Sequence, residues 1–170
     1  MTINKATISD AVTIALLGRF TFTETFGHLF SDKTDLLNYF EQTFNVEKLS
    51  KSIEKPNNLY WLASINGLPV GYAKLKLDSP SSFIDSNSIC QLQKIYVLKD
   101  FLAQKVGLAL QNKLLEKAND LGFKKIWLSV LKENLRAITF YEKNGFTAIG
   151  NHNFQIGKEH FDFQAMSKNL

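Results

Sequence analysis

Residues 93–121, in the middle of the chain, read QKIYVLKDFLAQKVGLALQNKLLEKANDL. It begins with the β-branched and aromatic run Ile95-Tyr96-Val97, continues through a basic connector over residues 98–107, and ends in a run with apolar residues at helical spacing. The pattern predicts a strand, a loop and a helix. A helix N-terminus beside Lys99 and Lys105 suits a phosphate or another anion, although many such units are purely structural.

The composition is that of one globular domain covering residues 1–170. Hydrophobic residues make up 45% of the chain and charged residues 21%, and a chain of 170 residues can bury about two-thirds of its unfolded surface. The single cysteine, Cys90, excludes an internal disulfide and a cysteine-based zinc site, and we expect no metal. Residues 11–17 form the longest apolar run and are too few to cross a bilayer, so we expect a cytoplasmic protein without a membrane partner.

Positive charge is concentrated in the second half of the chain. Residues 1–88 contain 8 Lys or Arg and 9 Asp or Glu, whereas residues 89–170 contain 12 and 7. This excess could serve nucleic acid, a phosphorylated cofactor, or solubility alone. Because no helix-turn-helix, zinc-finger or aromatic RNA-binding pattern is present, we expect no nucleic-acid partner and favour a phosphorylated small molecule.

The N-terminal region has mostly helical patterns. Residues 2–8 alternate loosely and predict an edge strand, and Ser9-Asp10 predicts the cap of a first helix. Whether residues 20–28 continue this helix or form an aromatic loop stays open. Two further helices are expected, with caps at Asp32 or Thr34 and at Asn45.

Strands predominate from residue 59 onward. Residues 59–65 and 70–77 flank Asn66-Gly67, which predicts an antiparallel hairpin, and residues 78–88 form a loop long enough to be a lid. In residues 89–97 the apolar Leu92 and Ile95 are three positions apart, which predicts a β-bulge because a regular strand cannot place both on one face.

The remaining elements set the fold class. A strand at 124–131 should lie parallel to the strand at 89–97, because a helical crossover is the usual connection between parallel strands. A helix over residues 134–144 and a closing hairpin over residues 146–166 follow. We therefore predict an α/β or α+β fold with a mixed sheet.

Two motifs together resemble the GNAT superfamily of acyl-CoA-dependent N-acyltransferases. The first is Ile95-Tyr96-Val97 with its basic connector and helix, and the second is NLRAITFYEKNGF at residues 134–146. With Glu24-Thr25-Phe26 and residues 149–157, most of the chain is similar to bacterial spermidine/spermine acetyltransferases of the PaiA type. The resemblance implies a GNAT-like mixed, mostly antiparallel twisted sheet with a central parallel strand pair, flanked by helices on both faces.

The resemblance allows two placements of the family's cofactor loop, Gln/Arg-x-x-Gly-x-Gly/Ala. Residues 104–109 match it literally, but that placement turns three polar helix residues inward, whereas a loop ending at Gly107 turns three apolar residues inward. These sets are Asn112, Glu116 and Asp120, and Leu110, Leu114 and Ala118. We therefore place the loop at residues 102–107, with Leu102 at the family's Gln/Arg and Lys105 at its first glycine.

By this resemblance the chain is expected to transfer acetyl from acetyl-CoA directly to a small primary amine, with polyamines such as spermidine and spermine as one candidate. The predicted catalytic residues are Tyr141, as the acid that protonates the leaving thiolate, and Glu24, as the ligand of the amine. Tyr141 could instead only pack inside its helix, and Asn134 could bind pantetheine, cap its helix, or do both. The predicted cofactor-binding residues are Ile95, Tyr96, Val97, Leu102, Ala103, Gln104, Lys105, Val106, Gly107, Leu108, Asn134, Ala137 and Tyr141.

The general base cannot be assigned from these motifs. Related enzymes often have Glu on the strand before Ile95, where this chain has Gln91 and Gln93, and an amide cannot serve as the base. The remaining candidates are Glu24, His28, Asp78, Asp85 and His152. Two other functions stay open, namely a non-catalytic acyl-CoA-binding or regulatory domain and an acetyltransferase of peptide or protein amines, and the chain could be a monomer or a homodimer.

Overall fold

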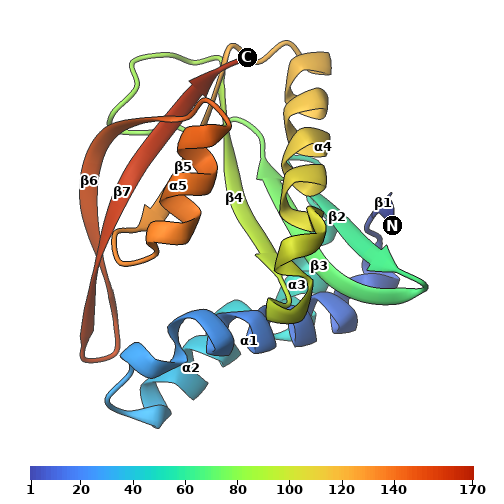
Figure 1. Ribbon diagram of the computed structural model, residues 1–170, viewed down its shortest axis with the longest axis vertical. Helices are drawn as coiled ribbons and strands as arrows, with labels where there is room; N and C mark the ends of the chain where they lie inside the picture. Colours follow the sequence, from blue (N-terminus) through green and yellow to red (C-terminus); the bar gives the residue numbers. More distant parts are fainter.

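The computed structural model describes all 170 residues, Met1 to Leu170. Seven strands form one sheet in the order β1-β2-β3-β4-β5-β7-β6, and helices pack on both of its faces (Figure 1). All neighbouring strands are antiparallel except β4 and β5, which are parallel. The predicted mixed, mostly antiparallel sheet with a central parallel pair is confirmed.

The elements have the following bounds. The strands are β1 (Thr2–Lys5), β2 (Asn58–Ile65), β3 (Leu68–Lys76), β4 (Ile89–Val97), β5 (Lys125–Leu131), β6 (Thr147–Ile156) and β7 (Glu159–Asn169). The α-helices are α1 (Ala11–Phe26), α2 (Lys33–Thr43), α3 (Val46–Glu54), α4 (Val106–Asp120) and α5 (Leu135–Lys143). Short 3-10 helices occupy Ile8–Asp10, Gly27–Leu29 and Lys99–Gln104.

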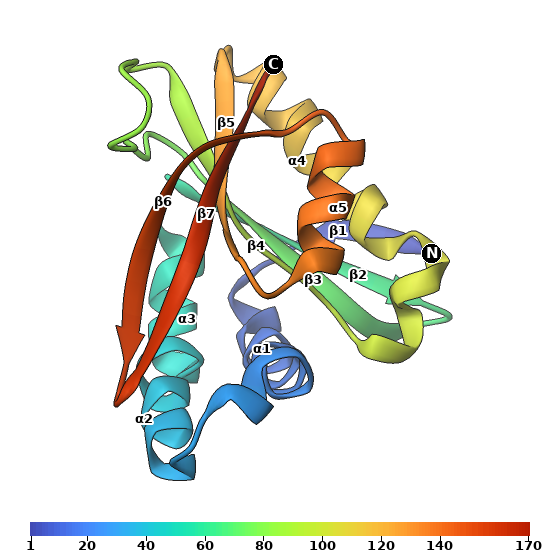
Figure 2. The same ribbon diagram turned by 60° about the vertical axis from the view of Figure 1, so that its left-hand side comes forward.

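The sheet has a back face covered by α4 and α5 and a front face covered by α1, α2 and α3. On the back face, Leu110 and Leu114 of α4 join Leu92 and Leu128 of the sheet in one apolar cluster. On the front face, residues of α1 and α3 pack against Tyr60 and Tyr72, and α1 and α2 pack against β5, β6 and β7. Figure 2 shows the two groups of helices on either side of the twisted sheet.

The segment at residues 20–28, which the sequence left open, is helical as far as Phe26. The hydroxyls of Thr21 and Thr23 donate to the carbonyls of Leu17 and Arg19 at 2.6 and 2.8 Å, so these threonines are accommodated inside α1. The next two helices begin at the predicted caps. At these caps, Asp32 Oδ1 accepts from Thr34 N–H at 2.8 Å and Asn45 Oδ1 accepts from Lys48 N–H at 3.1 Å.

The N-terminus differs from the prediction in two details. The edge strand ends at Lys5, and a 3-10 turn follows at Ile8–Asp10. Asp10 does not cap α1 with its side chain, because its Oδ2 accepts from the backbone N–H of Thr7 at 2.8 Å. The cap therefore lies one turn earlier than predicted, at Thr7. The hydrogen bonds between Thr7 and Asp10 favour a turn over extended backbone, so the strand ends before them.

The predicted hairpin turn and bulge are both present. Asn66 and Gly67 have φ angles of 51° and 81°, as a two-residue hairpin turn requires. Along the β3–β4 ladder, Lys74 pairs with Lys94 and Leu75 with Leu92, so Gln93 is left over as the bulged residue. The bulge puts Leu92 and Ile95 on the same face of the sheet.

The β6–β7 hairpin runs down the left side of the view, and its tip lies beside α2 (Figure 1). Asp35 Oδ2 accepts from the backbone N–H of Lys158 at 2.9 Å, and the Lys158 ammonium lies 3.2 Å from Asp32. Gly157, at φ 58°, lies so close to Asp35 that a Cβ atom there would overlap the carboxylate. The hairpin tip is therefore fastened to α2.

None of the helices combines the length and apolar character needed to cross a membrane.

Candidate active site

The two parallel strands separate in the middle of the sheet. Pairing between β4 and β5 covers three residue pairs and ends at Gln91 and Trp127. Beyond the bulge at Gln93, β4 has no partner on its β5 side, and Figure 1 shows the two strands running apart from the top of the view. The result is an opening in the sheet with unpaired backbone on its β4 edge.

Ile95 and Val97 present their backbone N–H and C=O groups to this opening. Leu98 N–H donates to the Val70 carbonyl at 2.9 Å, which fixes the alternation of the β3–β4 ladder. Tyr96 therefore bonds to β3, and its neighbours on either side point the other way. A free N–H at this edge can donate to an oxygen that gains negative charge during acyl transfer.

Tyr96 differs from its two neighbours in the predicted cofactor-binding set. Its backbone is taken by β3, and its ring lies on the front face, with its centroid 5.6 Å from that of Tyr72 and 6.2 Å from that of Phe44. Tyr96 thus helps to form the floor of the front face.

The basic connector is helical, so the prediction of a loop there is wrong. Lys99–Gln104 is a 3-10 helix that contains Leu102, Ala103 and Gln104, and α4 already begins at Val106. Lys105 joins the two helices with a φ of 59°, in the left-handed region that side-chain-bearing residues rarely adopt. The chain changes direction at this one residue. It occupies the position that the sequence analysis matched to the first glycine of the GNAT cofactor loop.

The burial pattern of α4 agrees with a cofactor loop that ends at Gly107. Leu110, Leu114 and Ala118 are fully buried, whereas Asn112, Glu116 and Asp120 are exposed. The first helical hydrogen bond joins Ala109 N–H to the Lys105 carbonyl at 3.0 Å.

The first turn of α4 offers free donors. Because bonding begins at Ala109, the N–H groups of Val106, Gly107 and Leu108 have no carbonyl partner within the helix. Apart from the adjoining residues and the backbone of the helix itself, nothing lies within 4 Å of the place where a Cβ on Gly107 would be, so the turn is open to a ligand. These donors, the helix dipole and the Lys105 ammonium fit a pyrophosphate.

Helix α5 and its cap contribute Asn134, Ala137 and Tyr141 on the back face of the sheet. Asn134 Oδ1 accepts from Ala137 N–H at 3.1 Å, so Asn134 is a helix cap, and its amide Nδ2 has no partner within the chain. The Ala137 side chain packs against the back-face core.

Tyr141 is the buried phenol of this site. Its ring centroid lies 5.2 Å from that of Phe140 and 5.6 Å from that of Phe146, and its hydroxyl makes no hydrogen bond within the chain. Burial raises the pKa of Tyr141 well above the ordinary value of a phenol. The hydroxyl therefore carries its proton at neutral pH and can donate it to a departing thiolate.

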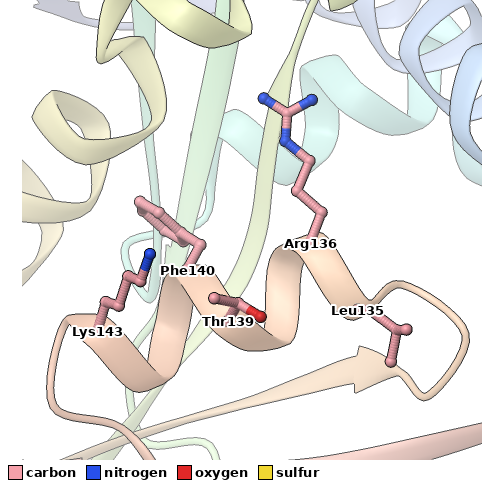
Figure 3. Close-up of a pocket in the computed structure, with 5 residues that line it drawn as sticks. All are labelled: Leu135, Arg136, Thr139, Phe140 and Lys143. Carbon is pink, nitrogen blue, oxygen red and sulfur yellow. The ribbon is translucent and has the colours of Figure 1, made fainter.

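A surface cavity of about 450 Å³ lies along α5 and adds residues that the sequence analysis did not single out. It is lined by Leu135, Arg136, Thr139, Phe140 and Lys143. Figure 3 shows Arg136, Phe140 and Lys143 extending from one side of the helix. The spacing of two helical turns between Arg136 and Lys143 could have indicated a shared basic face.

Ser129 and His152 border the opening from the front. Ser129 follows Trp127 by two positions, so it lies where β5 has already left β4. Its Oγ lies 2.8 Å from Nε2 of His152, a half-buried side chain whose ring stacks on Phe163 at a centroid distance of 5.4 Å and an interplanar angle of 9°. The pair is held in place and has a nitrogen that can accept a proton.

The other candidate bases have different surroundings. Glu24 is exposed, and its Oε2 accepts from the backbone N–H of Lys99 at 3.1 Å, which ties α1 to the connector. His28, Asp78 and Asp85 are exposed and make no side-chain hydrogen bond. No group of three or more His, Cys, Asp or Glu side chains is arranged to hold a metal ion.

Comparison with known sequences identifies relatives across most of the chain. A model of the acetyltransferase (GNAT) family matches residues 22–146. An uncharacterized N-acetyltransferase in the pepI 3′ region of Lactobacillus delbrueckii subsp. lactis is 30% identical over 144 residues, which cover 84% of this chain and 82% of that protein. An uncharacterized N-acetyltransferase of Mycobacterium tuberculosis is 27% identical over 135 residues, covering 79% and 82%.

Solved structures share the whole fold. The PaiA N-acetyltransferase from Thermoplasma acidophilum, solved in complex with coenzyme A, has a TM-score of 0.77 at 20% identity, with all of both chains covered. The ribosomal-protein-S18-alanine N-acetyltransferase from Escherichia coli has a TM-score of 0.70 at 19% identity, covering 99% of this chain and 92% of that one. At these identities the likeness establishes the fold alone.

Proposed function

The chain belongs to the GNAT family of acetyltransferases, and we propose that it transfers acetyl directly to the primary amine of a small molecule, using residues 1–170 as one domain. Acetyl-CoA is the cosubstrate of this N-acetyltransferase. The opening between β4 and β5 is the observation that carries the proposal, because the backbone of Ile95 and Val97 is unpaired on that side and both residues pack against the apolar cluster that contains Tyr141.

Two regions would hold acetyl-CoA. The N–H groups of residues 106–108 and the Lys105 ammonium suit its phosphates, as do the neighbouring connector residues 102–104 and the basic face of α5. The free backbone of Ile95 and Val97 and the unpaired Nδ2 of Asn134 suit the amides of pantetheine.

The reaction needs one proton acceptor, one oxyanion donor and one proton donor. His152, oriented by Ser129, takes a proton from the acceptor ammonium so that the neutral nitrogen can attack the thioester carbon. A backbone N–H at Ile95 or Val97 stabilises the negative charge on the carbonyl oxygen while the new C–N bond forms. The C–S bond then breaks and Tyr141 gives its proton to the sulfur, while the proton lost by the new amide nitrogen restores the phenol.

The acceptor has two candidate classes. Polyamines such as spermidine and spermine are favoured by similarity to the PaiA type, whose structure shares the fold. Peptide or protein amines are the second class, since an enzyme that acetylates the alanine of a ribosomal protein also shares the fold. Glu24 is the proposed ligand of the acceptor amine, and a cytoplasmic location and a monomeric or homodimeric state belong to the same proposal.

The test is release of CoA thiol by the purified protein with acetyl-CoA and a panel of polyamines, monoamines, amino acids and peptides. We expect turnover with at least one small primary amine and a product with one added acetyl group by mass spectrometry. Binding of acetyl-CoA without turnover on any amine would favour the non-catalytic acyl-CoA-binding domain. Consumption of peptides alone would favour the second class of acceptor.

A further inference from the structure

Two lysines lie next to each other on the front face of the sheet. Lys74 of β3 and Lys94 of β4 are direct cross-strand partners. Their side chains share this face with Tyr60, Tyr96 and Phe44, because cross-strand partners point to the same side. Lys94 Nζ lies 5.0 Å from the ring centroid of Phe44 and 5.2 Å from that of Tyr96, and Lys74 Nζ lies 5.2 Å from that of Tyr60.

Neither ammonium has a counter-ion. The four salt bridges of the chain use Arg19, Lys51, Lys113 and Lys158 as their cations. Lys74 is 8% exposed, and its only hydrogen bond is a long one, 3.4 Å, to Ser52 Oγ. Lys94 is half-buried and makes no hydrogen bond. Burial lowers the pKa of each lysine to about 8, which marks how poorly these charges are compensated within the chain.

No acidic side chain of the helices on the front face forms a salt bridge with either lysine: Glu47 of α3 is bound to Lys51, and Glu54 is exposed. The carboxylates of α1, of α2 with its cap, and of the β6–β7 turn each accept a hydrogen bond from another group. They are Glu24, Asp32, Asp35, Glu41 and Glu159. The front face therefore has unmatched positive charge, and a polycation would be repelled there.

Lys94 also lies where an acceptor has to be bound. It immediately follows the bulge at Gln93 and precedes Ile95, whose backbone faces the opening. Across the opening, Ser129 and His152 border the same face. A molecule whose amine reaches the opening from the front can thus bring a second group to the Lys94 ammonium.

We propose that the acceptor is a primary amine that carries a carboxylate, and that Lys94, with Lys74 behind it, binds this carboxylate. The inference rests on the proposed function and narrows its acceptor from small amines in general to amino-acid-like ones, in place of a polycation. The carboxylate supplies a counter-ion for the two lysines, which have none within the chain. The aromatic rings around Lys94 exclude water from the resulting ion pair.

The test uses amines in matched pairs that differ only by a carboxylate, such as lysine with cadaverine and tyrosine with tyramine, with spermidine as the polycation. We expect kcat/KM from CoA release to be at least about 10-fold higher for the carboxylate-bearing member of a pair. Lys94→Met should lower kcat/KM for that member about 10- to 100-fold more than for its partner, whereas Lys94→Arg keeps part of the preference. Lys33→Met, at an exposed α2 lysine without a hydrogen bond, is the control.

The outcomes separate this inference from the proposed function. A wild-type preference for cadaverine, tyramine or spermidine, or equal losses for both members of a pair in Lys94→Met, would overturn the carboxylate site while the transferase activity stands. Absence of turnover with every amine would overturn both. Thermal melting of each variant confirms that the losses do not arise from unfolding.

Discussion

Gln91 and Trp127, the last residues that pair β4 with β5, are both bonded to the same loop residue, Ser79. The indole Nε1 of Trp127 donates to the Ser79 carbonyl at 2.8 Å, and the Ser79 hydroxyl donates to Gln91 Oε1 at 3.1 Å. The point at which the strands separate is thus held by a buried serine of the long loop between β3 and β4. Residues further along both strands are free to border a ligand.

Replacing Tyr141 by Phe should lower kcat about 10²- to 10⁴-fold without changing the fold. The substitution removes the proton that the leaving thiolate needs, but it breaks no hydrogen bond and keeps the packing against Phe146. Steady-state CoA release and thermal melting check the two parts. Full activity of the variant would exclude Tyr141 as the acid, and a lower melting temperature would indicate a structural role.

His152→Gln should reduce kcat by about 10² or more, because Gln can bond to Ser129 but cannot act as the base. Ser129→Ala should cost less, roughly 10-fold or below, since the imidazole keeps its stacking on Phe163. Partial recovery of a His152→Ala variant by added imidazole would support proton transfer directly. Equal losses in the serine and glutamine variants would favour a role in positioning only.

Lys105 is expected to store strain, because its φ of 59° disfavours any side chain with a Cβ. Lys105→Gly should leave the free energy of unfolding unchanged or raise it by up to about 1 kcal/mol, whereas Lys105→Val should lower it by about 1 kcal/mol or more. Urea unfolding of the three proteins measures the difference. A glycine variant that is clearly less stable than wild type would show that the ammonium, and not the backbone, matters here.

The sequence predicts elements whose signal lies in neighbouring residues. It does not predict features that depend on which helix covers a strand or on the order of the strands in the sheet. The apolar period of α4 and the three-residue spacing of Leu92 and Ile95 indicate the helix register and the bulge, both of which are present. Lys105 carries no signal of its left-handed backbone, because nothing in a lysine favours that region.

Other parts of the site depend on partners that are distant in sequence. Lys74 and Lys94 alternate with apolar residues as solvent-facing lysines do, yet α1 and α3 cover that side of the sheet. Ser129 and His152 meet only because β7 lies between β5 and β6, an order that places residues 23 positions apart within bonding distance. No local pattern reports such a pairing.

Two roles of Glu24 can be separated by substitution: its hydrogen bond to Lys99, which affects stability, and its negative charge, which affects amine binding. Glu24→Gln keeps an oxygen that can accept from Lys99 N–H, so its stability should match wild type, and Glu24→Ala should lose about 1 kcal/mol. If Glu24 binds the acceptor ammonium, the Gln variant should still raise KM for the amine about 10-fold or more. An unchanged KM in the Gln variant would leave Glu24 with the structural bond alone.

Lys94→Met should make the protein more stable at pH 7, by about 1 kcal/mol or more, because it removes a poorly solvated charge whose neighbours are aromatic rings and which has no counter-ion. Burial lowers the pKa of Lys94 from 10.5 to about 8. Below pH 8 the ammonium is protonated in both the folded and the unfolded chain, so the native state bears the full cost.

Between pH 8 and 10.5 the folded chain releases this proton while the unfolded chain keeps it. The unfolded state then binds more protons, so the free energy of unfolding of the wild type rises with pH. The methionine variant lacks the part of this pH dependence that comes from Lys94. It retains the part from Lys74, because burial also lowers the pKa of Lys74 to about 8. The stability difference between the two proteins, measured by urea unfolding at pH 7, 8 and 9.5, should therefore shrink as pH rises. A constant difference would mean that Lys94 is solvated well enough in the free protein to need no counter-ion, and it would weaken the case for a carboxylate on the acceptor.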